Sequence, residues 1–519
     1  MAGKSMQKAQ HTAYTILGQS SVYERMFYVL NHLGIQSNIM TSATYSSVDF
    51  RLTKPVILAA LRTVVQKHAG LWVVFVQRPS SKRGHHDLLK ARLDTIDLET
   101  CVEFEHDNGK GVEAALLERL HNEWDLASDE PDKPWWKVVV KGQDIIFVCH
   151  HSVADGIGTY VFHREFLAAL NAMEWPQPPI PYPAPTEIHT SAVLGSLPKD
   201  PVVHGGLRFK LWDLVCYTLF ILLLNWFLLR WIIFDSLPSA RPCGRDISHP
   251  PGPESRTVSR ISSLRIPASR MTRVIEACRA NDTTFTPLLL ILMTLTLASD
   301  HFPDAKFAWT RYAHDLRPLV DMDAIGDNGP TGDILNATGG GHHFYWLRRF
   351  RDADAALHGK ISSDGSAIWD LVREYKQEME RARHGSASSM YQSAVLLGTS
   401  LEDFVARAFG SFEMSLPRTI HVSNLGPFTP TATDSKMDNG GQKSSEKNPG
   451  PWKVEEVQFS VGATNGTVGT RGIILSGAGI RGGDTIINAT YEEGIVTREM
   501  AEDVLEGLMN RLEALIALD

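Results

Sequence analysis

A run of sixteen residues without a charged side chain, residues 214–229, limits the topologies open to this chain. Asp213 and Arg230 bound the run, and Asn225 interrupts it. The run is shorter than the roughly 20 residues that cross a bilayer core. Extending it to Phe234 would bury Arg230, which costs about 2.5–3.5 kcal/mol near the bilayer centre. A single crossing would also place the two halves of the chain on opposite sides of a membrane, where they could not share one site.

The hydrophobic segment, residues 214–234, therefore has three interpretations. We favour a monotopic or re-entrant membrane anchor, and a buried core helix or a true single span are the alternatives. Proline-rich residues 175–185 lie ahead of it and are typical of an extended linker. The chain is thus predicted to comprise a first globular part over residues 1–190, a linker over 191–250 that contains the segment, and a second globular part over 251–519.

The composition argues against a nucleic-acid partner, and the cysteines favour a reducing compartment. The 519 residues are 43% hydrophobic and 21% charged, which is an ordinary globular composition. The formal net charge is −8 and no long basic run is present, so we expect no nucleic-acid partner. The first residues lack the apolar core of a secretory signal peptide. Cysteine spacing indicates a reducing, intracellular environment rather than a zinc or redox pair. The cysteines are Cys101, Cys149, Cys216, Cys243 and Cys278.

A strand-loop-helix pattern near residue 150 is the main candidate for a site. Residues 136–140 and 145–149 read as two β-rich runs joined by a tight turn at Gly142, and residues 157–173 read as a helix with a broad apolar face. The motif HHSVADG occupies the loop between the second strand and the helix. Short loops on a rigid scaffold commonly carry function.

The loop offers His150, His151, Asp155 and Gly156 for chemistry. A neutral imidazole, whose unperturbed pKa is about 6.5, can take a proton from a hydroxyl near neutral pH. Asp155 either acts on the ring or pairs with a distant arginine, and Gly156 lets the chain turn and the helix pack closely. The competing readings are a metal site, which adjacent histidines at a strand end disfavour, and polar residues that only satisfy a strand end.

The rest of the chain supplies ordinary α/β patterns. Residues 477–482, GAGIRG, match the pattern G-x-G-x-x-G, but the chain continues into a β-like run rather than a helix. This disfavours phosphate binding. Residues 339–346, GGGHHFYW, are interpreted as a flexible turn that enters a strand, and Asn336 to Thr338 as a chance glycosylation match. No G-x-S-x-G elbow occurs. We predict a helix over 54–70, a strand and two helices within 255–299, a strand over 307–315, a helix over 368–383, an exposed polar loop over 430–452, a hairpin within 472–494 and a closing helix over 498–518.

The motif HHSVADG resembles the HHxxxDG signature of the acyltransferase superfamily that includes chloramphenicol acetyltransferase-like enzymes, plant BAHD acyltransferases and condensation domains of peptide synthetases. SSVYERMFYVLNHLG near the start, DLRP, IWDLVREYKQEME and HVSNLGPF look like its alcohol acetyltransferase branch. The resemblance implies an α/β (α+β) fold with two chloramphenicol acetyltransferase-like domains. Each would be a mixed sheet with flanking helices, and the site would lie in a tunnel between them.

The resemblance also implies roles for single residues. His151 would be the general base that deprotonates an acceptor hydroxyl, with His150 orienting the loop. Asp155 would be structural, and we predict Arg317 of DLRP as its partner. The DFGWG motif of the plant and condensation relatives is absent; Ser423 or Asn424 of SNLG either donates to the oxyanion or forms a plain turn. No metal is expected.

The function that the resemblance implies is acyl-CoA-dependent O-acyltransfer. The donor would be acetyl-CoA or another acyl-CoA, used as co-substrate without a bound cofactor, and the acceptor a lipophilic alcohol or secondary metabolite. An amine acceptor, a carrier-bound donor or a cyclisation would use the same fold, and a non-catalytic membrane-associated scaffold is the third class. Membrane association through residues 214–234 would place the protein at the cytosolic face of the endoplasmic reticulum or a lipid droplet. The acceptor, the acyl length, the pathway and the oligomeric state do not follow from the sequence.

Overall fold

The structure, a computed structural model, describes residues 13–174, 186–193, 196–197, 199, 211–223, 227–234, 246–319, 332–359, 365–396, 398, 400–407, 419–430, 450–465 and 471–518. The predicted linker over 175–185 and most of the predicted polar loop lie outside these residues. The helices are α1 (Val22–His32), α2 (Lys54–Lys67), α3 (Ala114–Asn122), α4 (Gly156–Ala172), α6 (Leu211–Leu223), α7 (Ala268–Ala280), α8 (Phe285–Thr296), α9 (Arg348–Leu357), α10 (Ser366–Leu396), α11 (Leu401–Val405) and α12 (Arg498–Leu518).

A mixed 5-stranded sheet forms the centre of the first half. Its order is β14 (Lys453–Val461), β2 (Asn38–Ser46), β8 (Asp144–His150), β7 (Trp136–Lys141) and β6 (Val102–Phe104). The predicted hairpin is present as β7 and β8, which pair antiparallel, and Gly142 in its turn has a φ of 61°. Every residue of both strands is buried. Apolar layers cover both faces of the sheet, so the strands read as near-continuous apolar runs.

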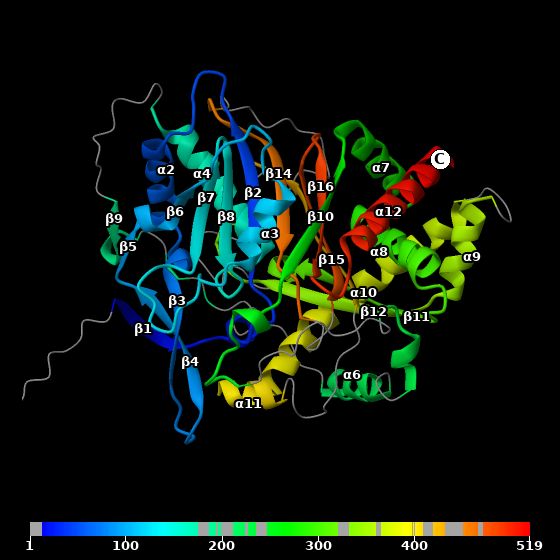
Figure 1. The fold of residues 1–519 in the computed structure, drawn as a ribbon, viewed down its shortest axis with the longest axis horizontal. Helices are drawn as coiled ribbons and strands as arrows, with labels where there is room; N and C mark the ends of the chain where they lie inside the picture. Colours follow the sequence, from blue (N-terminus) through cyan, green and yellow to red (C-terminus); the bar gives the residue numbers. More distant parts are fainter. Residues whose placement is uncertain are drawn as a thin grey trace, which may run out of the picture.

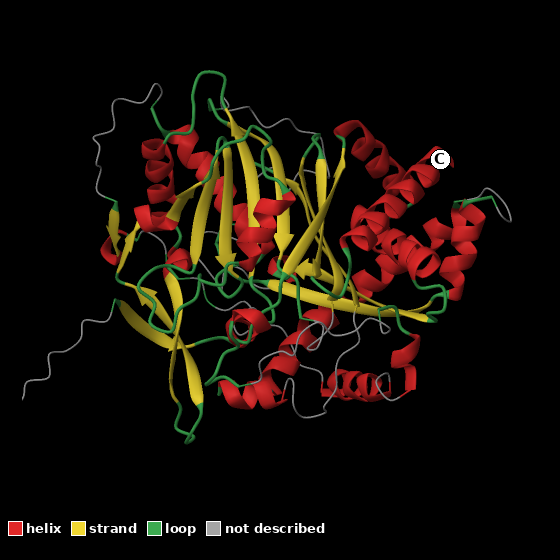
Figure 2. Ribbon diagram, in the orientation of Figure 1, coloured by secondary structure: helices red, strands yellow, loops and turns green. Residues whose placement is uncertain are grey.

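A mixed 6-stranded sheet forms the centre of the second half. Its order is β10 (Ser259–Ile266), β16 (Thr485–Glu492), β15 (Arg471–Ile480), β13 (Thr419–Phe428), β11 (Phe307–Asp315) and β12 (Thr338–Trp346). Helices α7, α8, α9, α10 and α12 gather on its outer side (Figures 1 and 2). Together these two sheets and their helices form the two-part α/β fold that the resemblance implied.

Two smaller sheets complete the first half. One has the order β1 (Tyr14–Gln19), β4 (His86–Leu93) and β3 (Val73–Pro79), and the other pairs β5 (Thr95–Asp97) with β9 (Glu187–His189).

The second half contributes one strand to the first sheet. β14 follows the second half's β13 in the chain, yet it pairs antiparallel with β2 at the edge of the first sheet. Val457, Phe459 and Val461 of β14 belong to the core of the first half. A strand from late in the sequence, β14, is therefore part of the same sheet as β2, a strand from near its beginning (Figure 1).

The glycines at 339–341 lie inside a strand, so the predicted flexible turn is wrong at this place. β12 runs from Thr338 and pairs with β11 along its length. A Cβ on Gly341 would lie 2.2 Å from the Tyr312 ring, and one on Gly339 would lie 2.7 Å from the His314 ring. The glycines are needed because bulky rings of β11 cross over them.

In its described residues the hydrophobic segment is neither one continuous helix nor buried throughout. α6 covers residues 211–223, and residues 227–234 contain a short 3-10 helix, Leu229–Trp231, followed by a bridge from Ile232 to Phe307. Ile233 and Phe234 are buried in the core of the second half, and the backbone of Ile233 donates to Phe307 at 3.0 Å. Several apolar side chains on α6 are exposed, so this part of the segment does not match the buried-helix alternative.

No single helix in the described part of the chain has the length and hydropathy to span a membrane. One bent pair, Ala268–Ala280 with Phe285–His301, meets those two criteria jointly, at an angle of 98°.

Candidate active site

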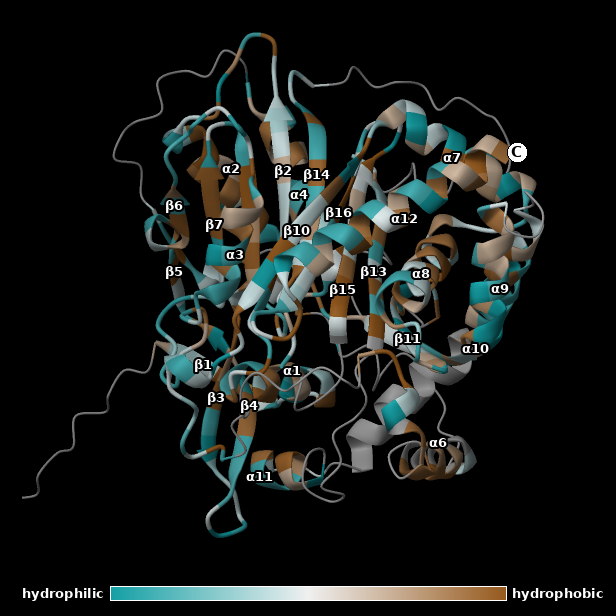
Figure 3. Ribbon diagram, turned by 45° about the vertical axis from the view of Figure 1, so that its right-hand side comes forward, coloured by the Kyte–Doolittle hydropathy of each residue, from teal (hydrophilic) through white to brown (hydrophobic). Residues whose placement is uncertain are grey.

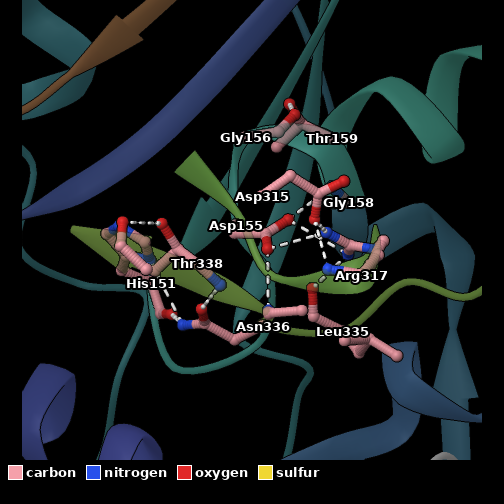
Figure 4. Close-up of polar contacts among 12 residues, drawn as sticks. His151, Asp155, Gly156, Gly158, Thr159, Asp315, Arg317, Leu335, Asn336 and Thr338 are labelled. Atoms are coloured by element: carbon pink, nitrogen blue, oxygen red, sulfur yellow. Dashed lines mark hydrogen bonds and ion pairs between the residues drawn. The ribbon is translucent and has the colours of Figure 1, made fainter. Parts of the chain in front are cut away.

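The candidate site lies where β8 ends and α4 begins (Figure 4). β8 ends at His150, and the next residues form a turn that is closed by the Val153 N–H, which donates to the His150 carbonyl at 2.9 Å. Asp155 is the N-cap of α4, and its carboxylate accepts from the Gly158 N–H at 2.7 Å. The hairpin and the helix cap together set the path of the loop.

The Asp155 carboxylate is occupied by donors from the second half. Arg317 donates to it from both Nη atoms, at 2.9 and 3.2 Å, and the Ala337 N–H donates at 2.7 Å. Burial lowers the pKa of Arg317, but Asp155 and Asp315 outweigh it, and the net direction is upward. The side chains of the pair are 4% and 2% exposed. The structure thus contains the ion pair predicted from the sequence, and the carboxylate holds the loop against the second half.

His150 points into the core. Its Nδ1 accepts from the Ser152 N–H at 3.1 Å, and its ring packs beside Trp135, with centroids 4.9 Å apart. Burial, and secondarily the neighbouring His151, lowers the pKa of His150 from 6.5 to about 3. A histidine that stays neutral inside the core fits the orienting role predicted for it better than proton transfer.

His151 is only half-buried and lies between the two halves of the molecule. Phe27 of α1 stacks on its ring, with centroids 3.7 Å apart and planes 13° apart. Asn336, which precedes β12, donates from Nδ2 to the His151 carbonyl at 2.7 Å and lies 3.5 Å from Nδ1 of the ring. Contacts from both halves therefore hold His151, because Phe27 stacks on its ring and Asn336 donates to its main chain. Figure 4 shows the contact with Asn336.

A small hollow, open to solvent, borders this loop. The loop contributes Ser152 and Val153, and the second half contributes Ile334, Leu335 and Asn336. Its other lining residues are Ser21, Tyr23, Glu24, Gly70, Val73, Lys90, Leu197 and Lys199. A molecule bound in the hollow would touch Ser152, which follows His151 in the loop, and Asn336, which contacts the His151 main chain. The tunnel that the resemblance implies stays a prediction.

Gly156 permits close packing rather than an unusual backbone. A Cβ at this position would lie 2.5 Å from the Leu425 side chain and 3.0 Å from the Phe459 ring. Leu425 lies in β13 and Phe459 in β14. The second part of the chain therefore packs directly on the start of α4. Any larger residue at position 156 would displace Leu425 and Phe459.

Ser423 and Asn424 lie within β13, so the SNLG segment is part of a strand. Asn424 donates from Nδ2 to Thr286 at 3.0 Å and accepts from the Gly426 N–H at 3.1 Å. The Gly426 carbonyl in turn accepts from the Tyr160 hydroxyl of α4 at 3.0 Å. These contacts place the segment against α4, and an oxyanion role for Ser423 or Asn424 stays a prediction.

Sequence reasoning missed Phe27 and Asn336. Phe27 was part of a resemblance motif without a role of its own, and Asn336 was set aside as a chance glycosylation match. The signal for Asn336 was its position shortly before a strand and after the DLRP turn that supplies Arg317. The contact itself joins residues 185 positions apart, which no local pattern reveals.

The histidines of β12 also have a partner that the sequence did not reveal. His343 Nδ1 lies 2.9 Å from the Glu378 carboxylate of α10, a residue 35 positions away in the sequence. The Tyr345 hydroxyl donates to the same carboxylate at 3.1 Å. Across the parts of the chain that the structure describes, no group of three or more His, Cys, Asp or Glu side chains is arranged to hold a metal ion.

Comparisons with known proteins agree on one family. The family model described as alcohol acetyltransferase matches residues 21–438. The probable alcohol acetyltransferase FCK4 of Fusarium pseudograminearum is 22% identical over 435 residues, which are 80% of this chain and 78% of that protein. The probable alcohol acetyltransferase crmB of Aspergillus fumigatus is 27% identical over 170 residues, 29% of this chain and 35% of that protein.

Solved structures share the fold at low sequence identity. TRI3 trichothecene 15-O-acetyltransferase from Fusarium sporotrichioides has a TM-score of 0.63 and 11% identity, over 98% of this chain and 97% of its own. The epimerization domain from the third module of tyrocidine synthetase B has a TM-score of 0.55 and 14% identity, over 99% of both chains.

Proposed function

This chain belongs to the alcohol acetyltransferase family and is an acyltransferase, and from that premise we propose that it transfers an acetyl group from acetyl-CoA to a hydroxyl of a lipophilic alcohol or secondary metabolite. The observation that carries the proposal is the half-buried imidazole of His151, held in one orientation beside a hollow that both halves line. Acyl-CoA is a co-substrate in this proposal.

We assign the proton transfer to His151. Its neutral imidazole takes the proton of the acceptor hydroxyl as the oxygen attacks the thioester carbonyl. The carbon–sulfur bond then breaks, and the imidazolium returns the proton to the leaving thiolate of CoA. The role of Asp155 in this scheme is to hold the loop, because its carboxylate is already bound by Arg317 and two backbone N–H groups.

The proposal is tested by thiol release. Purified protein receives acetyl-CoA and a panel of lipophilic alcohols, and free CoA is measured against reactions without acceptor. We expect alcohol-dependent release that falls at least about 100-fold in His151→Ala, while circular dichroism shows that the variant is folded.

Other outcomes would redirect the proposal in defined ways. Release with amines but not alcohols would favour an amine acceptor, and release only from longer acyl-CoA would change the donor. No release from any acyl-CoA would favour a carrier-bound donor or a cyclisation. An unchanged rate in His151→Ala would remove His151 as the base.

We further propose that α6 associates with a membrane surface. Residues 212, 215, 219 and 223 recur at helical spacing and form one exposed apolar face. The exposed fractions are 73% for Trp212, 37% for Val215, 60% for Leu219 and 52% for Leu223. On another side of the helix, Phe220 contacts Phe344 of β12, with ring centroids 5.5 Å apart. The helix is thus fixed to the protein while its exposed apolar side chains face solvent. Figure 3 shows α6 as a largely hydrophobic ribbon at the edge of the molecule.

Two cationic side chains lie over Trp231, near the end of the hydrophobic segment. Lys306 Nζ lies 3.6 Å from the centre of the Trp231 ring, and the Arg230 guanidinium lies 5.0 Å from it. An apolar helix face next to an aromatic ring and cationic groups is typical of an interfacial helix that lies in the plane of a membrane.

Vesicle sedimentation tests the surface. The protein should sediment with phosphatidylcholine vesicles, and more with vesicles that also contain phosphatidylserine. The triple variant Trp212→Glu, Leu219→Glu, Leu223→Glu should lose at least about tenfold in binding, because three apolar side chains that would enter the membrane surface are replaced by charges. Val48→Glu with Phe104→Glu, at exposed apolar positions elsewhere, is the matched control. Failure of the unaltered protein to sediment would reject the membrane proposal.

The cellular location that we propose, the cytosolic face of the endoplasmic reticulum or a lipid droplet, rests on this surface. Fractionation of cells that express the protein should find it with those membranes, and the triple variant should move to the soluble fraction. Equal distribution of the two proteins would remove α6 as the cause of any membrane location.

A further inference from the structure

One face of the His151 ring is covered by an aromatic side chain from α1. The centroids of Phe27 and His151 are 3.7 Å apart and their planes differ by 13°. Phe27 is 5% exposed, so it cannot swing away into solvent. It packs in an apolar cluster with Tyr23, Leu316, Leu335 and Ala337. Because three of these partners come from the second half, both halves hold Phe27 in place, and through it the ring.

The main chain of His151 is held separately. Asn336 Nδ2 donates to the His151 carbonyl at 2.7 Å, and its Oδ1 accepts from the Thr338 N–H at 3.4 Å, which sets the orientation of the amide. The next residue, Ala337, donates its N–H to Asp155 at 2.7 Å. Asn336 thus projects from a segment that is itself tied to the histidine loop.

We propose that Phe27 and Asn336 are positioning residues for His151, with Asn336 fixing its main chain and Phe27 fixing the ring plane and favouring the imidazolium. The inference rests on the proposed role of His151 as general base. The face of an aromatic ring is negative and attracts a cation placed over it. The contact therefore strengthens as the proton moves from the alcohol to the imidazole, which is when catalysis gains from it.

The charged surroundings of His151 do not change when Phe27 is replaced. Burial lowers the pKa of His150 to about 3, so this neighbour stays neutral over the range in which the reaction is measured. Titratable and charged groups on the surrounding elements include His150 and Asp155 of the loop, Tyr23, Glu24, Arg25 and His32 of α1, Lys90 of β4, His314 and Asp315 of β11, and Arg317 just after β11. A shift of the pH profile in a Phe27 variant therefore reports the ring contact.

The test compares Phe27→Leu and Phe27→Tyr by alcohol-dependent CoA release across pH. Phe27→Leu should lower kcat about tenfold and leave both KM values within twofold, because Phe27 does not line the hollow. In the plot of kcat/KM against pH, the acid limb should shift to lower pH by roughly half a unit, because the His151 imidazolium loses a stabilising contact. Phe27→Tyr keeps a ring at the same place and should restore both values.

Phe162→Leu is the matched control. Phe162 stacks on Phe147 with centroids 3.9 Å apart and planes 9° apart, so the control removes a similar stack that does not involve His151. It should leave the acid limb in place. Asn336→Ala should lower kcat about tenfold at every pH.

Three results would overturn the inference or its premise. If Phe27→Leu keeps the unaltered rate and acid limb while His151→Ala is inactive, the positioning role is wrong and the proposed function stands. If Phe162→Leu moves the acid limb as much as Phe27→Leu does, the effect is a general loss of packing. If His151→Ala stays active, the premise itself fails.

Discussion

Asp155 and Arg317 form a buried ion pair that joins the histidine loop to the second half. Replacing Asp155 by Asn removes the charge that Arg317 faces inside the protein and leaves Asp315, at 2.9 Å, as its remaining anion. Breaking a buried pair in this way commonly costs about 3–5 kcal/mol. Because Asp315 stays, we expect a loss of about 3 kcal/mol in the free energy of unfolding, measured by urea denaturation.

Asp315→Asn is the control for this pair. Its carboxylate also contacts Arg317 but its side chain is 29% exposed, so water can replace it and the loss should be near 1 kcal/mol. Equal losses in the two variants would contradict the view that the Asp155 contact carries the stability of the pair.

Among the secondary-structure elements, the sequence predicted those that interactions between neighbouring residues determine. The helix over 54–70 appears as α2, and the hairpin around Gly142 appears as β7 and β8, because residue spacing and turn chemistry determine such elements. The glycine-rich start of β12 was predicted as a turn, because glycines resemble a loop until the rings of Tyr312 and His314 are placed over Gly341 and Gly339. The sequence motif located His151, but its contacts with Phe27 and Asn336 depend on packing between distant elements.

The pairing of β14 with β2 could not be predicted from sequence, and a buried polar chain supports it. His121 of α3 lies with Nδ1 2.6 Å from Asn38 Oδ1 in β2 and with Nε2 2.8 Å from Ser460 Oγ in β14. The three side chains are between 0% and 3% exposed. The arrangement resembles a Ser-His-Asn catalytic set, but complete burial leaves no access for a substrate, so its contribution is to hold three elements together.

A double-mutant cycle tests this link. His121→Phe leaves the Asn38 and Ser460 groups buried without their partner and should cost about 2 kcal/mol. With Ser460→Ala, the unfolding free energies should show a coupling of about 1–2 kcal/mol. Ser46→Ala, at the exposed far end of the same strand pair, should show none with His121→Phe. Additive losses for His121 and Ser460 would mean that the hydrogen bond does not stabilise the strand pairing.

At the scale of the whole molecule, the site depends on several links between the halves. β14 completes the first sheet, the Asp155–Arg317 pair fixes the loop, and Phe27 packs against residues of the second half. Each half supplies part of the surroundings of His151, so we expect no activity from either half alone.

Buried histidines give the whole molecule a pH-dependent stability. Burial lowers the pKa of His121 and His150 to about 3 and that of His68 and His163 to about 4. Between pH 6.5 and 5 the unfolded chain binds protons at these residues and the folded protein does not, so the free energy of unfolding falls as pH falls. Each histidine contributes a slope that rises from about 0.7 kcal/mol per pH unit at pH 6.5 to about 1.3 kcal/mol per pH unit at pH 5.

His68 offers the cleanest test, because neither ring nitrogen has a hydrogen-bond partner within the described residues and the side chain is 1% exposed. His68→Leu removes a proton site without breaking a hydrogen bond. Relative to the unaltered protein, this variant should be more stable at pH 5.5 than at pH 7.5 by about 1.4 kcal/mol. The measurement is urea unfolding at both pH values, with His106→Ala, at an exposed histidine, as the control that should leave the pH dependence unchanged. A pH dependence that His68→Leu leaves intact would mean that the folded protein admits a proton at this buried ring.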